Sequence, residues 1–129
     1  MATVGLLHPG EMGAAVGGSL IPLGHEVLWD PAGRSRATTG RALAAGLTGV
    51  SFDRLIARSS VIFSICPPHA ALDVAAQVAA AGYAGIYADA NAISVATAEQ
   101  VSGIVTAAGA SYVDGGIIGP PPEIGRAHV

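Results

Sequence analysis

The feature of this sequence that most constrains its fold is a regular alternation between short apolar runs and segments with helical periodicity. The apolar runs have the length of strands and occupy residues 3–7, 25–29, 47–50, 61–65, 85–88 and 111–113. The helical segments, most of which end near a glycine, are residues 11–23, 35–45, 52–58, 69–81 and 94–108. Alternation with short connections gives parallel strands joined by right-handed crossovers. The sequence therefore predicts an α/β fold, a doubly wound parallel sheet of about six strands with helices on both faces.

The unusual residues of the chain gather at one place in this predicted fold. In a doubly wound sheet, ligands bind at the edge formed by the carboxyl ends of the strands. The chain segments expected at that edge are residues 8–10, 30–34, 66–68, 89–92 and 114–116. They contain the single cysteine, four of the eight prolines and the polar residues His8, Asp30, Arg34, Asp89, Asn91 and Asp114. We therefore expect a functional site at this edge of the sheet.

The composition limits the class of protein. The chain has 129 residues, enough for one domain but few for a complete two-substrate enzyme. Although 51% of the residues are hydrophobic, only 5% are aromatic, so small apolar side chains dominate and suit close packing of helices on a sheet. The net charge of −3 gives no electrostatic reason to expect nucleic acid as a partner.

Other classes of site and location have no support in the sequence. The chain contains one cysteine, Cys66, which excludes an internal disulfide, and its four histidines lack the spacing of metal ligands. The N-terminus has no basic region before its apolar residues, unlike a signal peptide. No apolar run reaches the ~18 residues of a membrane helix. We expect a cytoplasmic protein with no metal and no membrane partner.

The turn after the first expected strand has the sequence His8-Pro9-Gly10-Glu11-Met12-Gly13. In a dinucleotide-binding βαβ unit, Gly10 would let a phosphate approach the backbone and Gly13 would let the helix pack close to the strand. The N-terminus of that helix would then face the pyrophosphate. The G-x-G-x-x-G pattern has a further glycine where this chain has His8, whose side chain we expect to fill that space. An ordinary glycine-rich βα turn is the alternative.

The residues after the second expected strand bear on the choice between NAD and NADP. At this place an acidic residue would bind the ribose hydroxyls of NAD, whereas an arginine would pair with the additional phosphate of NADP. Asp30 is near the required position, but Pro31 follows it and could turn its carboxylate away. Arg34 and Ser35 offer a guanidinium and a hydroxyl at the start of a helix, with Arg36 as a further candidate. We predict NADP, with NAD as second choice; a surface helix with solvated arginines is the alternative.

Three further groups of residues follow later strands. Cys66-Pro67-Pro68 is expected to form a rigid, donor-poor wall of the cofactor pocket, because the proline ring fixes the backbone angle φ and proline has no N–H to donate. A nucleophilic Cys66 would require a base such as His69, but a small buried thiol is the commoner case. Asp89 and Asp114 each end a strand without an evident catalytic partner, and we expect them to cap the turns that follow.

With these residues in view, the chain resembles the NAD(P)-binding Rossmann domain of the 6-phosphogluconate dehydrogenase and β-hydroxyacid dehydrogenase superfamily. It is most similar to a branch of NAD(P)-dependent oxidoreductases whose phosphogluconate-dehydrogenase-like C-terminal domain has no assigned function. The likeness extends from residue 4 to residue 122. Four motifs of that branch occur in order: P-G-E-M-G-A-A-V-G at residues 9–17, S-x-C-P-P-H-A-A at 64–71, D-A-N-A-I-S at 89–94 and V-D-G-G-I-I-G-P-P at 113–121.

The resemblance implies roles for individual residues. Those implied to bind the cofactor are His8, Pro9, Gly10, Glu11, Met12, Gly13, Arg34, Ser35, Cys66, Pro67, Pro68, Asn91 and Ala92. Asn91 and Ala92 occupy the place where relatives often have Ser-Thr beside the nicotinamide. A substrate-facing strip is implied at Gly115, Gly116, Ile117, Ile118 and Gly119. Ile118 replaces a serine that binds hydroxyacids in relatives, which argues against a simple β-hydroxyacid substrate.

The end of the chain carries a separate expectation. In the family the catalytic lysine lies beyond this domain, near the helix that leads to the C-terminal domain, and this chain contains no lysine. We expect residues 1–122 to form the NAD(P)-binding domain, the C-terminal helical domain to be absent, and residues 123–129 to be a non-native tail. Residues 124–129 match the translation of a common sequencing adapter in one reading frame. A genuine short tail is the alternative.

The resemblance thus implies the cofactor-binding half of an NAD(P)-dependent oxidoreductase. Hydride would pass between the nicotinamide and a small hydroxy-acid, oxo-acid or imine-like substrate. No catalytic residue is expected in this chain, which would be inactive alone, and the full-length protein is expected to form a homodimer through its C-terminal domain. Two alternatives remain: a non-catalytic dinucleotide-sensing or regulatory module, and a doubly wound domain that binds another nucleotide or a partner protein.

Overall fold

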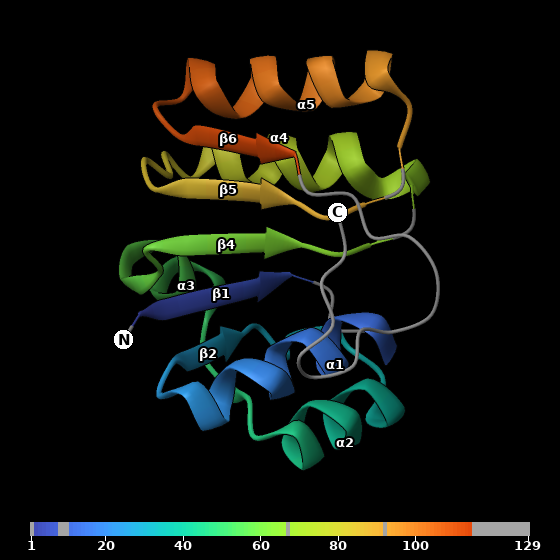
Figure 1. Cartoon of the computed structure of the whole chain (residues 1–129), viewed down its shortest axis with the longest axis vertical. Helices are drawn as coiled ribbons and strands as arrows, with labels where there is room; N and C mark the ends of the chain where they lie inside the picture. The colour runs from blue at the N-terminus through green and yellow to red at the C-terminus, as the bar shows by residue number, and fades with distance from the viewer. Residues whose placement is uncertain (1, 8–10, 67, 92, 115–129) are drawn as a thin grey trace.

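A computed structural model describes residues 2–7, 11–66, 68–91 and 93–114 and shows a sheet of six strands (Figure 1). In chain order the strands are β1 (Thr3–Leu7), β2 (Glu26–Trp29), β3 (Thr48–Gly49), β4 (Val61–Ser64), β5 (Ile86–Asp89) and β6 (Ser111–Asp114). Their order across the sheet is β3-β2-β1-β4-β5-β6, and all neighbours are parallel. This arrangement confirms the predicted doubly wound sheet, which is a Rossmann fold.

The direction in which the sheet grows reverses between β1 and β4. The chain builds outward from β1 through β2 to β3, and then returns to place β4 on the other side of β1. The connections that follow β1 and β4 therefore leave toward opposite faces of the sheet, and a crevice forms at the carboxyl ends of these two strands. The topology alone thus fixes where a ligand would bind.

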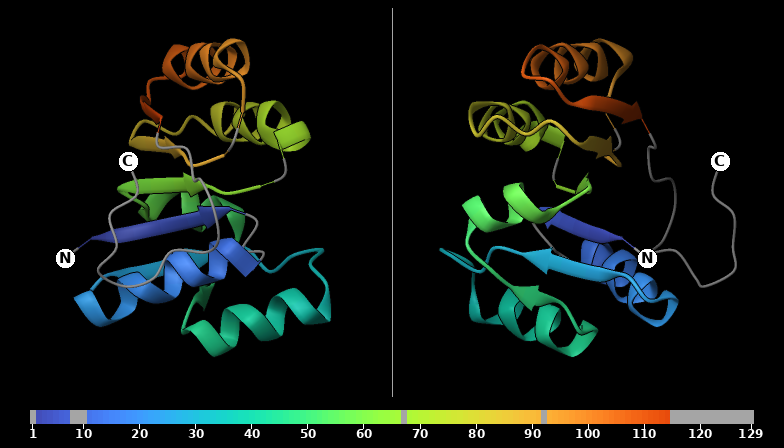
Figure 2. Two further views of the ribbon diagram at one scale, coloured as in Figure 1. Left: turned by 45° about the vertical axis from the view of Figure 1, so that its right-hand side comes forward. Right: turned by 90° about the vertical axis from the view of Figure 1, so that its left-hand side faces the viewer.

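Helices cover both faces of the sheet (Figure 1, Figure 2). The helices on one face are α1 (Glu11–Leu20) and α2 (Arg36–Ala45), and those on the other are α3 (Phe52–Arg58), α4 (Ala71–Ala80) and α5 (Val95–Ala107). Successive side chains of a strand point to opposite faces. In β1, Leu6 accordingly packs in the core below α1 and α2, and Leu7 packs in the core below α3, α4 and α5.

Two glycines let helices approach the sheet closely. A Cβ at Gly5 in β1 would lie 2.7 Å from Cδ2 of Leu55 in α3. A Cβ at Gly17 in α1 would lie 2.9 Å from Cδ2 of Leu47. Gly13, which the sequence predicts for close packing of α1, is buried, and Gly17 one turn later is a further point of close approach that the sequence pattern did not predict.

Prolines shift two helix boundaries from their predicted positions. The predicted helix over residues 11–23 ends as an α-helix at Leu20, and a 3-10 turn follows at Ile21–Leu23, because Pro22 has no N–H for an α-helical hydrogen bond. In the same way, a 3-10 turn at Pro68–Ala70 precedes α4, where the sequence predicts a helix from His69 onward.

Serine side chains fix the starts of three helices. The Oγ atoms of Ser35, Ser51 and Ser94 each accept a hydrogen bond from the backbone N–H three residues later, at 3.1, 3.2 and 3.1 Å respectively. Each bond satisfies a backbone donor that has no partner inside the helix. Ser51 and Ser94 thus start α3 and α5, and the cap at Ser35 fixes the start of α2 directly after Arg34.

Candidate functional site

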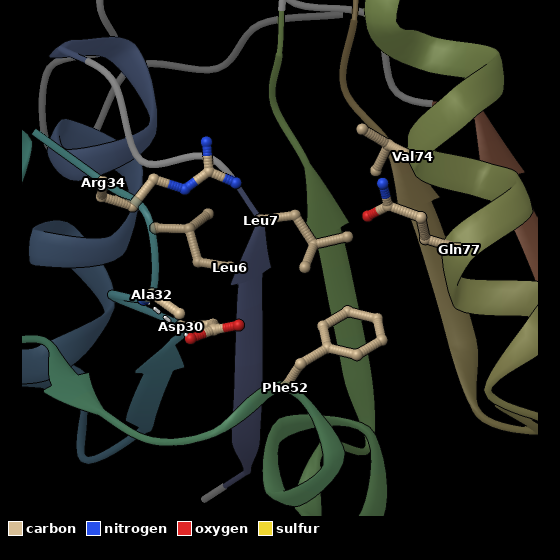
Figure 3. A pocket seen from close by; sticks show the side chains of 8 residues that line it. All are labelled: Leu6, Leu7, Asp30, Ala32, Arg34, Phe52, Val74 and Gln77. Atoms are coloured by element: carbon tan, nitrogen blue, oxygen red, sulfur yellow. Dashed lines mark hydrogen bonds between the residues drawn. The ribbon is translucent and has the colours of Figure 1, made fainter.

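A pocket of about 230 Å³ opens at the carboxyl edge of the sheet, beside the switch between β1 and β4 (Figure 3). Its lining comes from the end of β1, the loop after β2, the start of α3 and one side of α4. The lining residues are Leu6, Leu7, Asp30, Ala32, Arg34, Phe52, Val74 and Gln77. The pocket therefore lies where the topology places a ligand.

The pocket combines an apolar floor with a polar rim. Leu7 and Val74 belong to the buried core, while the side chains of Asp30 and Arg34, from the loop after β2, and of Gln77, from α4, point toward the middle of the pocket (Figure 3). A planar heteroaromatic base fits this arrangement, because its faces are apolar and a guanidinium can stack on them. The amide of Gln77 offers both a donor and an acceptor to the edge of such a base.

Asp30 lies in the pocket although Pro31 follows it. Its Oδ1 accepts a hydrogen bond from the N–H of Ala32 at 2.9 Å, which closes a tight turn around Pro31. This turn holds the carboxylate in the lining of the pocket. Although Pro31 follows it, Asp30 is one of the lining residues, and the loop presents a carboxylate as well as a guanidinium to the pocket.

The segment from Gly33 to Ser35 brings one of its two predicted phosphate-binding groups to the pocket. Gly33 has a φ of 71°, and the N–H of Arg34 donates to the carbonyl oxygen of Pro31 at 3.1 Å, so the backbone doubles back and directs the Arg34 side chain over the pocket (Figure 3). The Ser35 hydroxyl caps α2 and also donates to Oγ1 of Thr38 at 3.0 Å. Arg36 is exposed and is not part of the pocket lining.

The predicted pyrophosphate turn is described only in its second half. His8, Pro9 and Gly10 lie outside the described residues, whereas Glu11, Met12 and Gly13 form the first turn of α1. The start of α1 follows β1, whose last residues line the pocket. A helix N-terminus with its positive dipole end therefore lies next to the pocket, which suits an anionic group.

A buried polar cluster joins the ends of β4 and β5. Ser64, Asp89 and Asn91 are 0%, 1% and 4% exposed. Asn91 Oδ1 accepts from the N–H of Cys66 at 2.6 Å, and Asn91 Nδ2 donates to Ser64 Oγ at 3.1 Å. The N–H of Asn91 donates to Asp89 Oδ1 at 3.0 Å. The Asn91 side chain, predicted to bind cofactor, is thus engaged with the neighbouring strand.

Cys66 is in a setting that favours the neutral thiol. Burial raises the pKa of the Cys66 thiol, and the negative charge of Asp89 adds to this, while contact with Ser64 opposes it. Since the thiolate is the nucleophilic form, a raised pKa reduces reactivity. The setting thus disfavours a nucleophilic Cys66, although the thiol expected to be buried is only half-buried, and His69 is exposed in the following 3-10 turn.

Two carboxyl groups meet at the ends of β5 and β6. Asp89 and Asp114 are register partners in these strands. Burial raises the pKa of Asp89 above its ordinary value, hydrogen bonds from Asn91 oppose the shift, and the negative charge of Asp114 adds to it. The hydroxyl of Tyr112 donates to Asp89 Oδ2 at 3.4 Å. Asp89 caps the turn that follows it, as predicted, through the N–H of Asn91.

Several predicted site residues have no described environment. Pro67 and Ala92 lie outside the described residues, as does the whole predicted substrate-facing strip of Gly115, Gly116, Ile117, Ile118 and Gly119. The predicted tail at residues 123–129 also lies outside them. Pro68 begins the 3-10 turn before α4. The structure therefore bears on the cofactor side of the predicted site and not on its substrate side.

Part of the pocket lining was not predicted from the sequence. Phe52, Val74 and Gln77 belong to helices, and their spacing is that of ordinary amphipathic segments. Only the return of the chain to β4 brings α3 and α4 to the end of β1. A polar residue at position 77, one turn beyond the buried Val74, was the sole available signal.

Neither a metal-binding cluster nor a helix able to cross a membrane occurs in the described part of the chain. Residues 2–7, 11–66, 68–91 and 93–114 contain no group of three or more His, Cys, Asp or Glu side chains arranged to hold a metal ion. Among the helices formed by these residues, none has both the length and the apolar character needed to cross a membrane.

The chain is similar to solved structures of dehydrogenases and reductases, whereas a search among protein families and curated proteins finds no match. A conserved protein of unknown function, similar in structure to 3-hydroxyacid dehydrogenases, is 29% identical over 85% of this chain and 41% of its own, with a TM-score of 0.79. The 3-hydroxyisobutyrate dehydrogenase of Mycobacterium tuberculosis, solved with L-serine, is 28% identical over 88% of this chain and 40% of its own, with a TM-score of 0.78.

An imine reductase variant from Myxococcus stipitatus, solved with NAD⁺, shares the fold with 20% identity over 94% of this chain and 42% of its own, at a TM-score of 0.74. The structural neighbours are thus 3-hydroxyacid dehydrogenase-like proteins and imine reductases, and they match the superfamily that the motifs predict. The chain spans about two fifths of the length of these three structures. The chain thus has the fold of an NAD(P)-binding Rossmann domain.

Proposed function

We propose that this chain is the cofactor-binding part of an NAD(P)-dependent oxidoreductase and that its preferred cofactor is NADP. The observation that supports this most directly is the pocket at the switch point, in which Arg34, Asp30 and Gln77 surround an apolar floor. The related fold of hydroxyacid dehydrogenases, and of an imine reductase solved with NAD⁺, supports a nicotinamide cofactor.

The pocket suits the adenosine end of the cofactor. The adenine ring would lie against Leu7 and Val74, with the Arg34 guanidinium over one face and the Gln77 amide at its edge. From there the pyrophosphate would reach the start of α1, where backbone N–H groups and the helix dipole favour anions. The nicotinamide would extend toward the ends of β4 and β5. When bound, the cofactor would supply or accept a hydride at its nicotinamide ring.

The preference for NADP rests on Arg34. An arginine pairs strongly with a phosphate through several parallel hydrogen bonds, and Arg34 reaches the pocket from the loop after β2, where the ribose of the adenosine end would lie. Asp30 in the same loop favours ribose hydroxyls and repels a phosphate. We give Arg34 the larger weight because its side chain is exposed and can turn toward a phosphate, while Asp30 Oδ1 is bound to the N–H of Ala32.

Titration of the 129-residue chain with NADPH and NADH tests this proposal. We expect NADPH to bind more tightly, and we expect Arg34→Ala to weaken NADPH binding by about tenfold or more, the effect of losing one charge-assisted hydrogen bond, while NADH binding changes less. Arg41→Ala, in α2 and outside the pocket lining, is the matched control and should leave both affinities unchanged. Equal affinity for the two cofactors, or no effect of Arg34→Ala, would contradict the NADP assignment. If neither cofactor binds, the cofactor-binding function itself is wrong.

The reaction of the whole protein is a further part of the proposal. We expect hydride transfer with a small hydroxy-acid, oxo-acid or imine-like substrate, in a site completed by a helical C-terminal domain that also forms a homodimer. The related superfamily uses a lysine as general acid or base, and this chain contains none. We therefore expect the chain alone to bind cofactor without turning substrate over.

A further inference from the structure

The loop after β5 is joined to the loop after β4 through the buried side chain of Asn91. Both polar atoms of its amide are engaged there: Oδ1 accepts from the N–H of Cys66 at 2.6 Å, and Nδ2 donates to Oγ of Ser64 at 3.1 Å. Ser64 is the last residue of β4, and Asn91 comes two residues after the end of β5. Asn91 is 4% exposed and is not part of the pocket lining.

The main chain around Asn91 is itself fixed on both sides. The N–H of Asn91 donates to Asp89 Oδ1 at 3.0 Å, and its carbonyl oxygen accepts from the N–H of Ile93 at 3.1 Å. The N–H of Ala90 donates to the carbonyl oxygen of Ser64 at 3.1 Å. The main chain that carries the Asn91 amide is therefore held in place. Because the N–H of Cys66 requires an acceptor, it determines that the amide oxygen of Asn91, and not the nitrogen, faces Cys66.

The bond to Cys66 matters because of the sequence that follows. Pro67 and Pro68 have no N–H, so the N–H of Cys66 is the last backbone donor before His69. The chain that leaves β4 can be held by a backbone donor at Cys66 and not at the next two positions. Asn91 provides the acceptor for that donor.

We infer that Asn91 is a positioning residue of the cofactor site, which acts by holding Cys66 and the loop after β4 and not by touching the cofactor. The inference rests on the proposed function. Cys66 follows β4, one of the two strands at the switch point, and the next helix along the chain is α4, whose Val74 and Gln77 line the pocket. The bond from Asn91 thus fixes the β4 side of the crevice relative to β5.

The effect on binding distinguishes positioning from general stability. We expect Asn91→Ala to raise the Kd of NADPH about tenfold, because the chain after β4 would no longer be held in one conformation and binding would have to order it. The Kd of 2′,5′-ADP, which carries only the adenosine end, should rise less, since Asp30, Arg34 and Phe52 line the pocket from the loop after β2 and from α3, outside the chain that Asn91 holds. Asn91→Asp keeps an acceptor for the N–H of Cys66 and should restore most of the NADPH affinity.

Ser94→Ala is the matched control, because it removes the N-cap of α5 in the same β5–α5 connection without touching Cys66. It should lower the midpoint of thermal unfolding and leave the ratio of the two Kd values as in the wild type.

A second measurement needs no cofactor: hydrogen exchange of the Cys66 amide, followed by NMR, should be slow in the wild type and in Asn91→Asp and fast in Asn91→Ala.

The possible outcomes separate the inference from the proposed function. If the wild type binds neither NADPH nor NADH, the proposed function fails and the positioning role fails with it. If the wild type binds but Asn91→Ala keeps its NADPH affinity, or keeps a slowly exchanging Cys66 amide, the inference alone is wrong. Should Asn91→Ala not fold, Ser64→Ala replaces it, since it removes the second anchor of the amide and should raise the NADPH Kd in the same direction.

Discussion

Arg34 and Asp30 present opposite charges to one small pocket. Both belong to the loop after β2, and both side chains point toward the pocket in Figure 3. A phosphate on the ribose would be attracted by the guanidinium and repelled by the carboxylate, whereas ribose hydroxyls would be bound by the carboxylate. Under the proposed function, the preference between NADP and NAD would therefore be a balance between two neighbouring residues, and it could be shifted at either of them.

Asp30→Asn tests the other side of that balance. The amide oxygen of asparagine can still accept the hydrogen bond from Ala32, so the turn is retained while the charge is lost. We expect the ratio of NADPH to NADH affinity to rise by about tenfold, the equivalent of ~1.4 kcal/mol, because repulsion of the phosphate disappears and a hydroxyl acceptor weakens. Calorimetric titration with both cofactors measures the ratio. A ratio equal to that of the wild type would show that Asp30 does not face the ribose.

At the scale of residues, sequence patterns predicted part of this site. Arg34 could be identified because it follows a strand and precedes a helix, so its place at the sheet edge depends only on local order. Gln77 and Phe52 could not, because their helices come to the pocket through the long-range pairing of β1 with β4. The direction of the Asp30 carboxylate depends on a turn closed by its own side chain, which the sequence Asp30-Pro31 leaves open.

At the scale of elements, α3 packs on β1 at a distance that only glycine permits at position 5. A Cβ there would lie 2.6 Å from Ser59 Oγ and 2.7 Å from Leu55 Cδ2. We expect Gly5→Ala to lower the free energy of unfolding by about 1–3 kcal/mol, the usual cost of overpacking. Urea unfolding followed by circular dichroism measures the change.

Gly103→Ala is the control for that substitution. Gly103 is an exposed residue inside α5, and a Cβ added to it would have no neighbouring atom within 4 Å, so alanine meets open space there. We expect stabilisation by about 0.5–1 kcal/mol, since glycine is the weaker helix former. If both substitutions changed the stability in the same direction, close packing of α3 on β1 would not be the cause.

The sequence predicted which segments are helices and which are strands more accurately than it predicted where each one ends. Apolar runs and helical periodicity predicted all six strands and five helices, because both periods are local properties of the chain. The ends differ where hydrogen bonding, not hydrophobicity, decides the boundary, as at Pro22 and Pro68. The predicted strand over residues 47–50 is reduced to Thr48–Gly49, because pairing with β2 extends over only two residues.

At the scale of the whole molecule, the buried Asp89 makes stability depend on pH. Burial raises its pKa in the folded state, so between the ordinary carboxyl pKa and the raised one the folded state holds a proton that the unfolded state has lost. Stability from this group is therefore greatest at low pH and decreases as the pH rises through the folded pKa. The charged groups that face it are Asp114 and, when ionised, Tyr112, Tyr87 and Cys66.

Asp89→Asn tests this dependence. Asparagine keeps an acceptor for the N–H of Asn91 and removes the titrating group. We expect the free energy of unfolding of the variant, relative to the wild type, to increase from about pH 4 to about pH 7, as measured by urea unfolding at several pH values. A difference that stays constant across this range would mean that Asp89 titrates alike in the folded and unfolded chain.

The doubly wound type of the sheet also followed from the sequence, since alternation of strands and helices admits few topologies, whereas the order of the strands was not predicted. The substrate side of the site could not be derived in this way. Residues 115–119 lie outside the described structure, and the sequence shows only that Ile118 stands where relatives have a serine.

The central position of β1 has a consequence for synthesis of the protein. The strand that is made first pairs with β2 on one side and with β4 on the other, and β4 ends only at Ser64. At a translation rate of roughly 5–20 residues per second, β1 waits several seconds for its second neighbour. During that interval one edge of β1 has no partner from its own sheet, so a nascent chain stalled before Ser64 would expose unpaired backbone N–H and C=O groups to chaperones or to other chains.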